Sequence, residues 1–140
     1  MDVKRDCVCA RVRKASRAMT AIYDRFLSPA ELRVTQFSLL NNIKRLEQAT
    51  ITKLSETMLM DKTTLARNVK LLEKKGLVRI KAGKDRRFKE ISVTKKGLDS
   101  LAMARPLWVQ AQKHVTTCMG KNRMDHLIAD LSELSAIRVR

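Results

Sequence analysis

Apolar residues recur along most of this chain at intervals of three and four, the spacing that places them on one face of an α-helix. The period predicts helices over about residues 5–27, 33–47, 50–58, 62–75, 95–118 and 122–137. Between the fourth and fifth helices, apolar and polar residues alternate over residues 78–82 and 89–93, which predicts a half-buried β-hairpin. The fold class expected is mainly α, with one small β-hairpin.

Capping residues indicate where some of these helices begin and end. The segment SPAE at residues 28–31 has the serine, proline and glutamate of a capping box. It starts the second helix at once, or it closes a single turn before a helix that begins near Arg33. Asp61 is a suitable N-cap for the helix over residues 62–75, and Gly76 is placed to end that helix.

The last two helices are expected to begin at polar caps. Thr94 caps the fifth helix, which we expect to kink or break at Pro106, and Asn122 caps the sixth. The final helix carries a broad apolar face made by Met124, Leu127, Ile128, Leu131, Leu134 and Ile137. So long a face at the end of a small chain favours packing on a second subunit, although packing on the chain's own core remains open.

Positive charge is concentrated in the middle of the chain. The 140 residues carry a formal net charge of +16, and residues 61–97 hold 13 basic and 4 acidic side chains, a net of +9. This balance favours a polyanionic partner, with nucleic acid first and an acidic membrane surface second. Aromatic residues make up only 4% of the chain, which argues against a stacking platform for single strands.

The sequence holds no apolar run of the roughly 20 residues that a membrane span requires. Its first residues are charged and lack the apolar core of a secretory signal. Three cysteines do not suit the paired framework of a secreted domain. We therefore expect a cytoplasmic protein.

Two helices joined by a short turn and followed by a hairpin describe a winged helix-turn-helix. The helix over residues 62–75 is expected to enter the major groove, which is wide enough to admit one α-helix. Arginine can bond guanine, asparagine can bond adenine, and threonine can bond a base edge or a phosphate. We assign Thr63, Thr64, Arg67 and Asn68 to bases or nearby phosphates, and Lys62 and Lys70 to phosphates.

Three ordered segments of the chain resemble the MarR family of multiple-antibiotic-resistance-type regulators. They are LRVTQFSLL before the helix pair, ITKLSETMLMDKTTLARNVKLLEKKGLV across it, and KDRRFKEISVTKKG in the wing. The flanking helices also match in number and length, so the resemblance covers nearly the whole chain. It implies a single domain over residues 1–140, with a winged helix-turn-helix lobe at 48–97. Residues 1–47 and 98–140 would largely form the helices of a homodimer.

The family's wing carries an Asp-x-Arg motif, which this chain matches at Asp85-Arg86-Arg87. The resemblance implies that Arg87 reaches the minor groove and that Asp85 pairs with an arginine to hold the wing in shape. Lys84 and Arg86 add charge for DNA. The alternatives are that Asp85 only forms the turn, and that the basic wing is merely a solvated face. One departure is Arg33, where many members have a serine or threonine that caps the second helix.

Cys9 is a candidate thiol sensor. It lies near the start of the first helix, where the macrodipole and nearby arginines favour a thiolate. The segment from Cys9 also resembles the hydroperoxide-sensing branch of the family, except that Arg13 stands where that branch has a tyrosine. Cys7, two residues earlier on the same predicted helix, would point about 200° away and could not easily form a disulfide with Cys9. The alternative is that Cys9 is a small apolar residue at a helix start or dimer seam.

A small molecule is the other candidate effector, since the resemblance implies a pocket between the dimerisation helices and the DNA-binding lobe. The residues that we expect to line it are Met19, Tyr23, Phe37, Trp108 and His114, each of which is also suited to ordinary core packing. With only two histidines and no paired CxxC motif, we expect no metal site and no cofactor.

No glycine-rich phosphate loop, zinc-protease motif or nucleophile motif occurs in the sequence, which argues against an enzyme. The function expected is a homodimeric transcription regulator, a repressor that binds a pseudo-palindromic double-stranded DNA site and responds to a ligand or an oxidant. The alternative is a nucleoid-type protein that coats or bends DNA with little sequence preference. An oligomerisation module without DNA binding conflicts with the charge of the hairpin.

Overall fold

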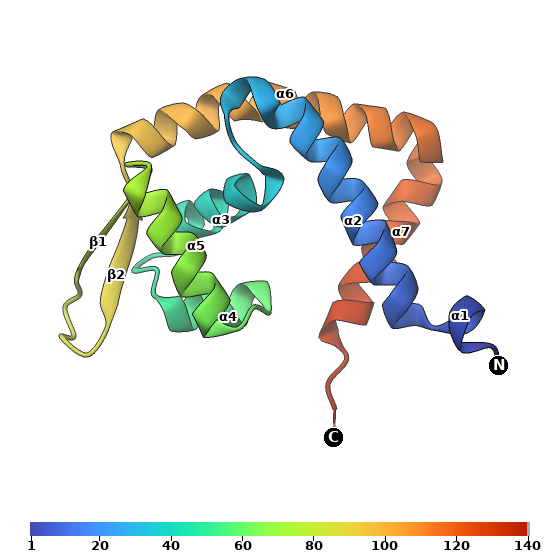
Figure 1. Ribbon diagram of the computed structural model, residues 1–140, viewed down its shortest axis with the longest axis horizontal. Coiled ribbons are helices and arrows are strands. Elements are labelled where there is room, and N and C mark those ends of the chain that lie inside the picture. The colour runs from blue at the N-terminus through green and yellow to red at the C-terminus, as the bar shows by residue number, and fades with distance from the viewer. Residues whose placement is uncertain (140) are drawn as a thin grey trace.

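The computed structural model describes residues 1–139 and arranges them in two parts (Figure 1). On the left of the view, three helices and a hairpin form one lobe, and on the right α2 and α7 form the other part, with α6 running across the top of both. The elements are α1 (Val3–Asp6), α2 (Val8–Leu27), the 3-10 turn η1 (Ser28–Ala30), α3 (Val34–Arg45), α4 (Ile51–Met58), α5 (Lys62–Lys74), β1 (Val78–Ala82), β2 (Lys89–Val93), α6 (Lys95–Met119) and α7 (Lys121–Ala136). The predicted fold class, mainly α with a small hairpin, is confirmed.

The core lies between α3, α4, α5 and the hairpin. The predicted inner face of α5 is fully buried, with Leu65, Val69 and Leu72 at 1% exposure or less. Leu54 of α4 and Leu40 of α3 pack in the same cluster and have no exposed surface. Burial of these side chains fixes one face of α5 inward and leaves its opposite face to solvent.

The hairpin forms over the residues that its alternation predicts, and it pairs the apolar positions of its two strands. Val78 faces Val93 and Ile80 faces Ile91 in an antiparallel pair. The loop before α4 adds one further bridge, because Ile91 donates its N–H to the Ala49 carbonyl at 2.8 Å. Through this bridge the hairpin is joined to the helix pair as well as to its own strands.

The first predicted helix is two helices in the structure. The chain is extended at Cys7, with φ −69° and ψ 107°, so α1 ends before it and α2 begins after it. The Cys7 sulfur accepts a hydrogen bond from the Ala10 N–H at 3.5 Å and so caps α2. The prediction of one continuous helix over residues 5–27 was wrong, because the extended Cys7 separates α1 from α2 and its sulfur caps the second of them.

Of the two starts left open for the second helix, the structure has the later one. Residues 28–30 form a single 3-10 turn, and Glu31 takes a left-handed conformation with φ 55°. The helix α3 then begins at Val34, with Arg33 in the N-cap position. The segment between α2 and α3 is therefore a sharp bend.

Two expectations for the last helices are corrected. Helix α6 continues through Pro106, so the break expected as one alternative is wrong, because both Pro106 and Ala102, whose carbonyl loses its usual partner, lie at the exposed surface where water can compensate. The kink, the other alternative, stays a prediction. Asn122 is not the cap of α7, which starts one residue earlier, directly after Gly120 at φ 87°. A backbone position with φ above zero suits glycine, and Gly120 ends α6 there.

An apolar surface is left without a partner within one chain. No residue of α7 is buried, and α2 buries only Leu27. The exposed apolar side chains of these two helices are Val8, Val12, Met19, Leu127, Ile128, Leu131 and Leu134. Within the part of the chain that is described, no helix is both long and apolar enough to cross a membrane.

Candidate nucleic-acid interface

Helix α5 is held at both ends by the residues predicted to cap it. The Asp61 carboxylate accepts a hydrogen bond from the Thr64 N–H at 3.0 Å, and hydrogen bonds from Thr64 hold the pKa of Asp61 below its usual range. Gly76, with φ 77°, turns the chain from α5 into β1. These caps fix the length of α5 and thereby the side chains that it exposes.

A stripe of polar and basic side chains follows the face of α5 opposite the core. Thr63, Arg67, Lys70 and Lys74 recur at intervals of four, three and four, and all are exposed. Lys74 was not among the predicted contact residues, although its spacing from Lys70 would have found it. The stripe offers one hydroxyl, one guanidinium and two ammonium groups along a single helix face.

The other predicted residues of α5 lie beside this stripe. Lys62 and Thr64 are exposed at the first turn of the helix. Asn68 is only half-exposed and lines a crevice with Arg33 and Gln36 at the start of α3. Its amide therefore faces away from the centre of the exposed stripe.

The wing tip contains the ion pair expected of its Asp-x-Arg segment. The Arg87 Nη2 lies 2.7 Å from the Asp85 Oδ2, and the Arg87 Nε lies 3.1 Å from both carboxylate oxygens. The Arg87 backbone N–H also donates to the Asp85 Oδ1 at 3.1 Å. Four hydrogen bonds thus fix the direction in which one arginine leaves the turn.

This pairing favours the charged forms of both groups. Hydrogen bonds from the Arg87 side chain and backbone lower the pKa of Asp85, and the carboxylate raises the pKa of Arg87. Both side chains lie at the surface, where salt and water weaken their attraction. The pair therefore serves to orient Arg87 more than to stabilise the fold.

The remaining basic residues of the wing, Lys84, Arg86 and Lys89, are exposed. Phe88 was not predicted to have a role, yet its ring is 46% exposed and lies 5.8 Å from the Arg87 guanidinium carbon. An aromatic residue directly after an Asp-x-Arg turn was the sequence feature that could have identified it.

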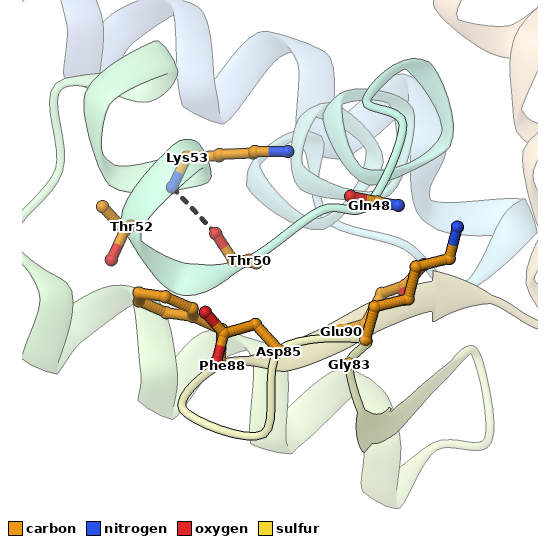
Figure 2. Close-up of a pocket in the computed structure, with 9 residues that line it drawn as sticks. Gln48, Thr50, Thr52, Lys53, Gly83, Asp85, Phe88 and Glu90 are labelled. Atoms are coloured by element: carbon orange, nitrogen blue, oxygen red, sulfur yellow. Dashed lines mark hydrogen bonds between the residues drawn. The ribbon is translucent and has the colours of Figure 1, made fainter.

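Figure 2 shows the space between the wing tip and the start of α4. The cavity has a volume of about 340 Å³, and the Phe88 ring and Asp85 line its lower side. Thr50, which caps α4 by accepting the Lys53 N–H at 3.2 Å, lies on the opposite side. The wing tip and the N-terminus of α4 thus border one cavity.

The candidate sensor Cys9 lies in the first turn of α2 and is exposed. Cys7 lies outside the helix, in the extended N-cap position. The geometric reason given against a Cys7–Cys9 disulfide assumed that both residues were helical, and it does not hold. Cys118, the third thiol, is exposed near the end of α6.

Four of the five residues expected to line a ligand pocket make aromatic packing or hydrogen-bond contacts within the chain, and Met19 does not. Phe37 and Trp108 stack with ring centroids 6.2 Å apart, and His114 contacts Phe26 at 5.6 Å. The Tyr23 hydroxyl bonds the Gln112 side chain, and burial raises the pKa of this tyrosine.

These contacts do not surround a shared space. The cavity that Trp108 lines is otherwise bordered by α6 residues such as Gln112 and Thr116, and by none of the other four residues. Met19 is 37% exposed on the unpartnered face of α2. Over residues 1–139, no cluster of three or more acidic, histidine or cysteine side chains is placed to hold a metal ion.

Comparisons with known proteins agree on one family. A family model described as the MarR family matches residues 27–87. The crystal structure of the M. tuberculosis transcriptional regulator MosR in complex with DNA is 38% identical to this chain, covering 93% of this chain and 96% of that one with a TM-score of 0.80. A search of curated protein sequences found no match.

More distant structures have the same fold. The transcriptional repressor CouR, solved with a 23-mer DNA duplex, is 21% identical over 96% of each chain, with a TM-score of 0.85. BpsR of Bordetella bronchiseptica, whose DNA binding is regulated by 6-hydroxynicotinic acid, is 16% identical over 95% of this chain and 96% of that one, with a TM-score of 0.84. At such identities the likeness extends to the fold alone.

Proposed function

Because this chain belongs to the MarR family of DNA-binding transcriptional regulators, we propose that it is a homodimeric repressor that reads a pseudo-palindromic operator with α5 and its wing. It is a regulator and not an enzyme. The observation that carries the proposal is the exposed stripe of α5 beside a wing whose arginine is held by Asp85. The cytoplasm, where such an operator would lie, is the proposed place of action.

In the proposed complex α5 lies in the major groove. Arg67 and Thr63 contact base edges or nearby phosphates, and Lys70 and Lys74 contact phosphates. Arg87 enters the neighbouring minor groove, where a narrow groove concentrates negative potential. Asp85 keeps Arg87 in one orientation, so less conformational entropy is lost when the arginine binds.

Regulators of this family act as dimers, and the apolar face of α2 and α7 is the surface that we assign to the second subunit. The predicted division placed residues 1–47 largely with dimerisation. Since α3 packs in the core of the DNA-binding lobe, we propose that the division falls at the bend between α2 and α3. Two recognition helices would then enter major grooves about 34 Å apart, one turn of DNA.

A selection from random duplexes tests this proposal against the nucleoid-type alternative. A regulator should enrich one short sequence with two-fold symmetry and half-sites about one helical turn apart. A coating protein should enrich no common sequence and should bind all duplexes of equal length alike. Recovery of no symmetric site would contradict the proposal.

For the effector we propose oxidation of Cys9. The thiolate would attack the terminal oxygen of an organic hydroperoxide and break its O–O bond, which oxidises Cys9 to a sulfenic acid and releases an alkoxide that takes a proton from water to leave as the alcohol. Its first-turn position and exposure support this chemistry. Treatment with an organic hydroperoxide should weaken DNA binding by the wild-type chain and by Cys118→Ser, but not by Cys9→Ser.

A small-molecule effector is the second candidate. It is supported by the aromatic and polar side chains gathered where α2, α3 and α6 meet, such as Tyr23 and Trp108. If Cys9→Ser and the wild type respond alike to hydroperoxide, the thiol proposal fails. A change in DNA affinity on addition of small aromatic acids would then favour a ligand.

A further inference from the structure

Two hydrogen bonds cross the bend that joins α2 to the DNA-binding lobe. Asp24, near the end of α2, accepts the Val34 N–H at the start of α3 through its Oδ1 at 2.7 Å. On the other side, Lys75 at the end of α5 donates its Nζ to the Glu31 carbonyl at 3.1 Å. The bend is thus connected both to the dimerisation helix and to the recognition helix.

Asp24 supplies a hydrogen-bond acceptor at the start of α3, where the N-cap residue Arg33 supplies none. The first N–H groups of a helix have no partner within the helix, and a short polar side chain at the N-cap usually accepts one of them. Arg33 occupies this position, but a guanidinium only donates. The Arg33 N–H itself is accepted by the Gln36 side chain at 3.1 Å. The Val34 N–H is therefore accepted by the carboxylate of Asp24, which lies ten residues earlier on another helix.

The apolar contacts at the bend come mostly from residues outside α2. Leu27 is the one buried residue of α2, and Ala30 and Leu32, which follow it, are buried in the core of the lobe. After Leu27 the chain passes through a three-residue 3-10 turn and the left-handed Glu31 before α3 begins. Asp24 and Lys75 border the same cavity of about 410 Å³ on the bend. The space beside the bend leaves room for α2 and the lobe to change their angle if the Asp24 bond is lost.

We propose that Asp24 is a positioning residue that sets the angle between α2 and the DNA-binding lobe, and thereby the half-site spacing that the dimer accepts. This inference rests on the proposed function, since it concerns a dimer that reads two half-sites. Successive base pairs are separated by about 3.4 Å, so a small rotation at the bend is enough to move a recognition helix out of register by one base pair.

Variants at two positions separate this role from a purely local cap. Asp24→Ala removes the acceptor, and Asp24→Asn keeps an acceptor oxygen at the same place. In Asp24→Ala/Arg33→Ser the serine at the N-cap can accept the N–H of Thr35 or Gln36 and so stabilises the start of α3 without a bond to α2, while the Val34 N–H is left to water. Arg33→Ser alone is the matched control, because it adds the local cap while Asp24 is retained.

Each variant is measured against a set of duplexes in which the spacing of the selected half-sites differs by zero, one or two base pairs. The readout is the ratio of affinities for the best and the altered spacings, with thermal unfolding measured in parallel. We expect Asp24→Asn and Arg33→Ser to keep the wild-type ratio. Asp24→Ala/Arg33→Ser should fold normally, but its ratio of affinities should fall by at least about five-fold. A change of about five-fold is the lower end of typical coupling between two sites.

An unchanged ratio in the double variant would overturn the inference and leave Asp24 as a helix cap only. Failure of both alanine variants to fold would also overturn it, since Asp24 would then be a folding residue. A wild-type chain that prefers no spacing and no symmetric site would instead contradict the proposed function, so the two failures are distinguishable.

Discussion

Single residues decide how the wing presents its charge. Asp85 lies among the four basic residues of segment 84–89, which are Lys84, Arg86, Arg87 and Lys89. The structure pairs Asp85 with the side chain and the backbone of Arg87. The motif predicted a pairing with an arginine, but the sequence did not specify which one. The choice depends on the turn geometry, in which residue 87 donates its backbone N–H to the same carboxylate.

Asp85→Ala should weaken DNA binding although it makes the wing more positive. Without its partner, Arg87 samples many rotamers and loses more conformational entropy on binding, which should lower the affinity by roughly two- to ten-fold. Fluorescence anisotropy with the selected duplex measures this. Asp99→Ala, which removes an exposed acid from α6, is the control for net charge. Tighter binding by Asp85→Ala would mean that Asp85 only forms the turn.

The carboxyl group of Asp85 should titrate below the ordinary aspartate value of 3.8, because hydrogen bonds from Arg87 favour its charged form. A carboxylate with a lowered pKa contributes stabilisation above its unfolded pKa and loses it as the pH falls through the folded pKa. The pair should therefore persist at neutral pH and break only in acid. Carbon NMR of the side chain measures the midpoint, and Arg87→Ala should return it toward 3.8.

At the scale of elements, periodicity located most helices and strands, but not their junctions. The buried face of α5 and the apolar face of the hairpin follow from apolar spacing alone. The start of α2 depends on a sulfur cap from Cys7, and the start of α3 depends on Asp24 across the bend. The sulfur of Cys7 is an unusual cap, and the bond from Val34 to Asp24 joins two different helices. Local sequence patterns therefore predict neither of them.

Gly97 marks the junction where α6 leaves the wing. A Cβ at this position would overlap the Leu77 carbonyl oxygen and lie 2.6 Å from the Val93 Cγ1. Gly97→Ala should therefore destabilise the fold by about 1–3 kcal/mol, as overpacking does. Urea unfolding measures the change, and Ala102→Ser, at an exposed position of the same helix, should differ little from wild type. Equal stability of Gly97→Ala and wild type would show that the hairpin can shift to admit the methyl group.

At the scale of the whole molecule, the exposed apolar face of α2 and α7 calls for a second subunit. The sequence predicted this from the long apolar face at the end of the chain, and the structure leaves every residue of α7 unburied. The effector could not be predicted in the same way. The sequence shows a thiol or an aromatic residue in the same way whether its side chain binds an effector or packs in the core.

Leu131→Glu should convert the dimer to a monomer, because it places a charge in the apolar face that we assign to the interface. Light scattering should give twice the 16.0 kDa of one chain for wild type and about 16.0 kDa for the variant. Leu71→Glu is the control, since Leu71 is an exposed leucine on α5 and lies outside that face. A dimeric Leu131→Glu variant would place the interface elsewhere.

The most direct test of the central claim compares the affinity of the wild-type dimer for its selected duplex with that for a scrambled duplex of equal length and composition. A regulator should prefer the selected duplex by about 10³ or more at physiological salt. If the two α5 helices and wings neutralise six to ten phosphates, affinity should also fall by roughly 10³–10⁵ between 50 and 200 mM salt. Equal affinity for the two duplexes, or a complex insensitive to salt, would contradict the account.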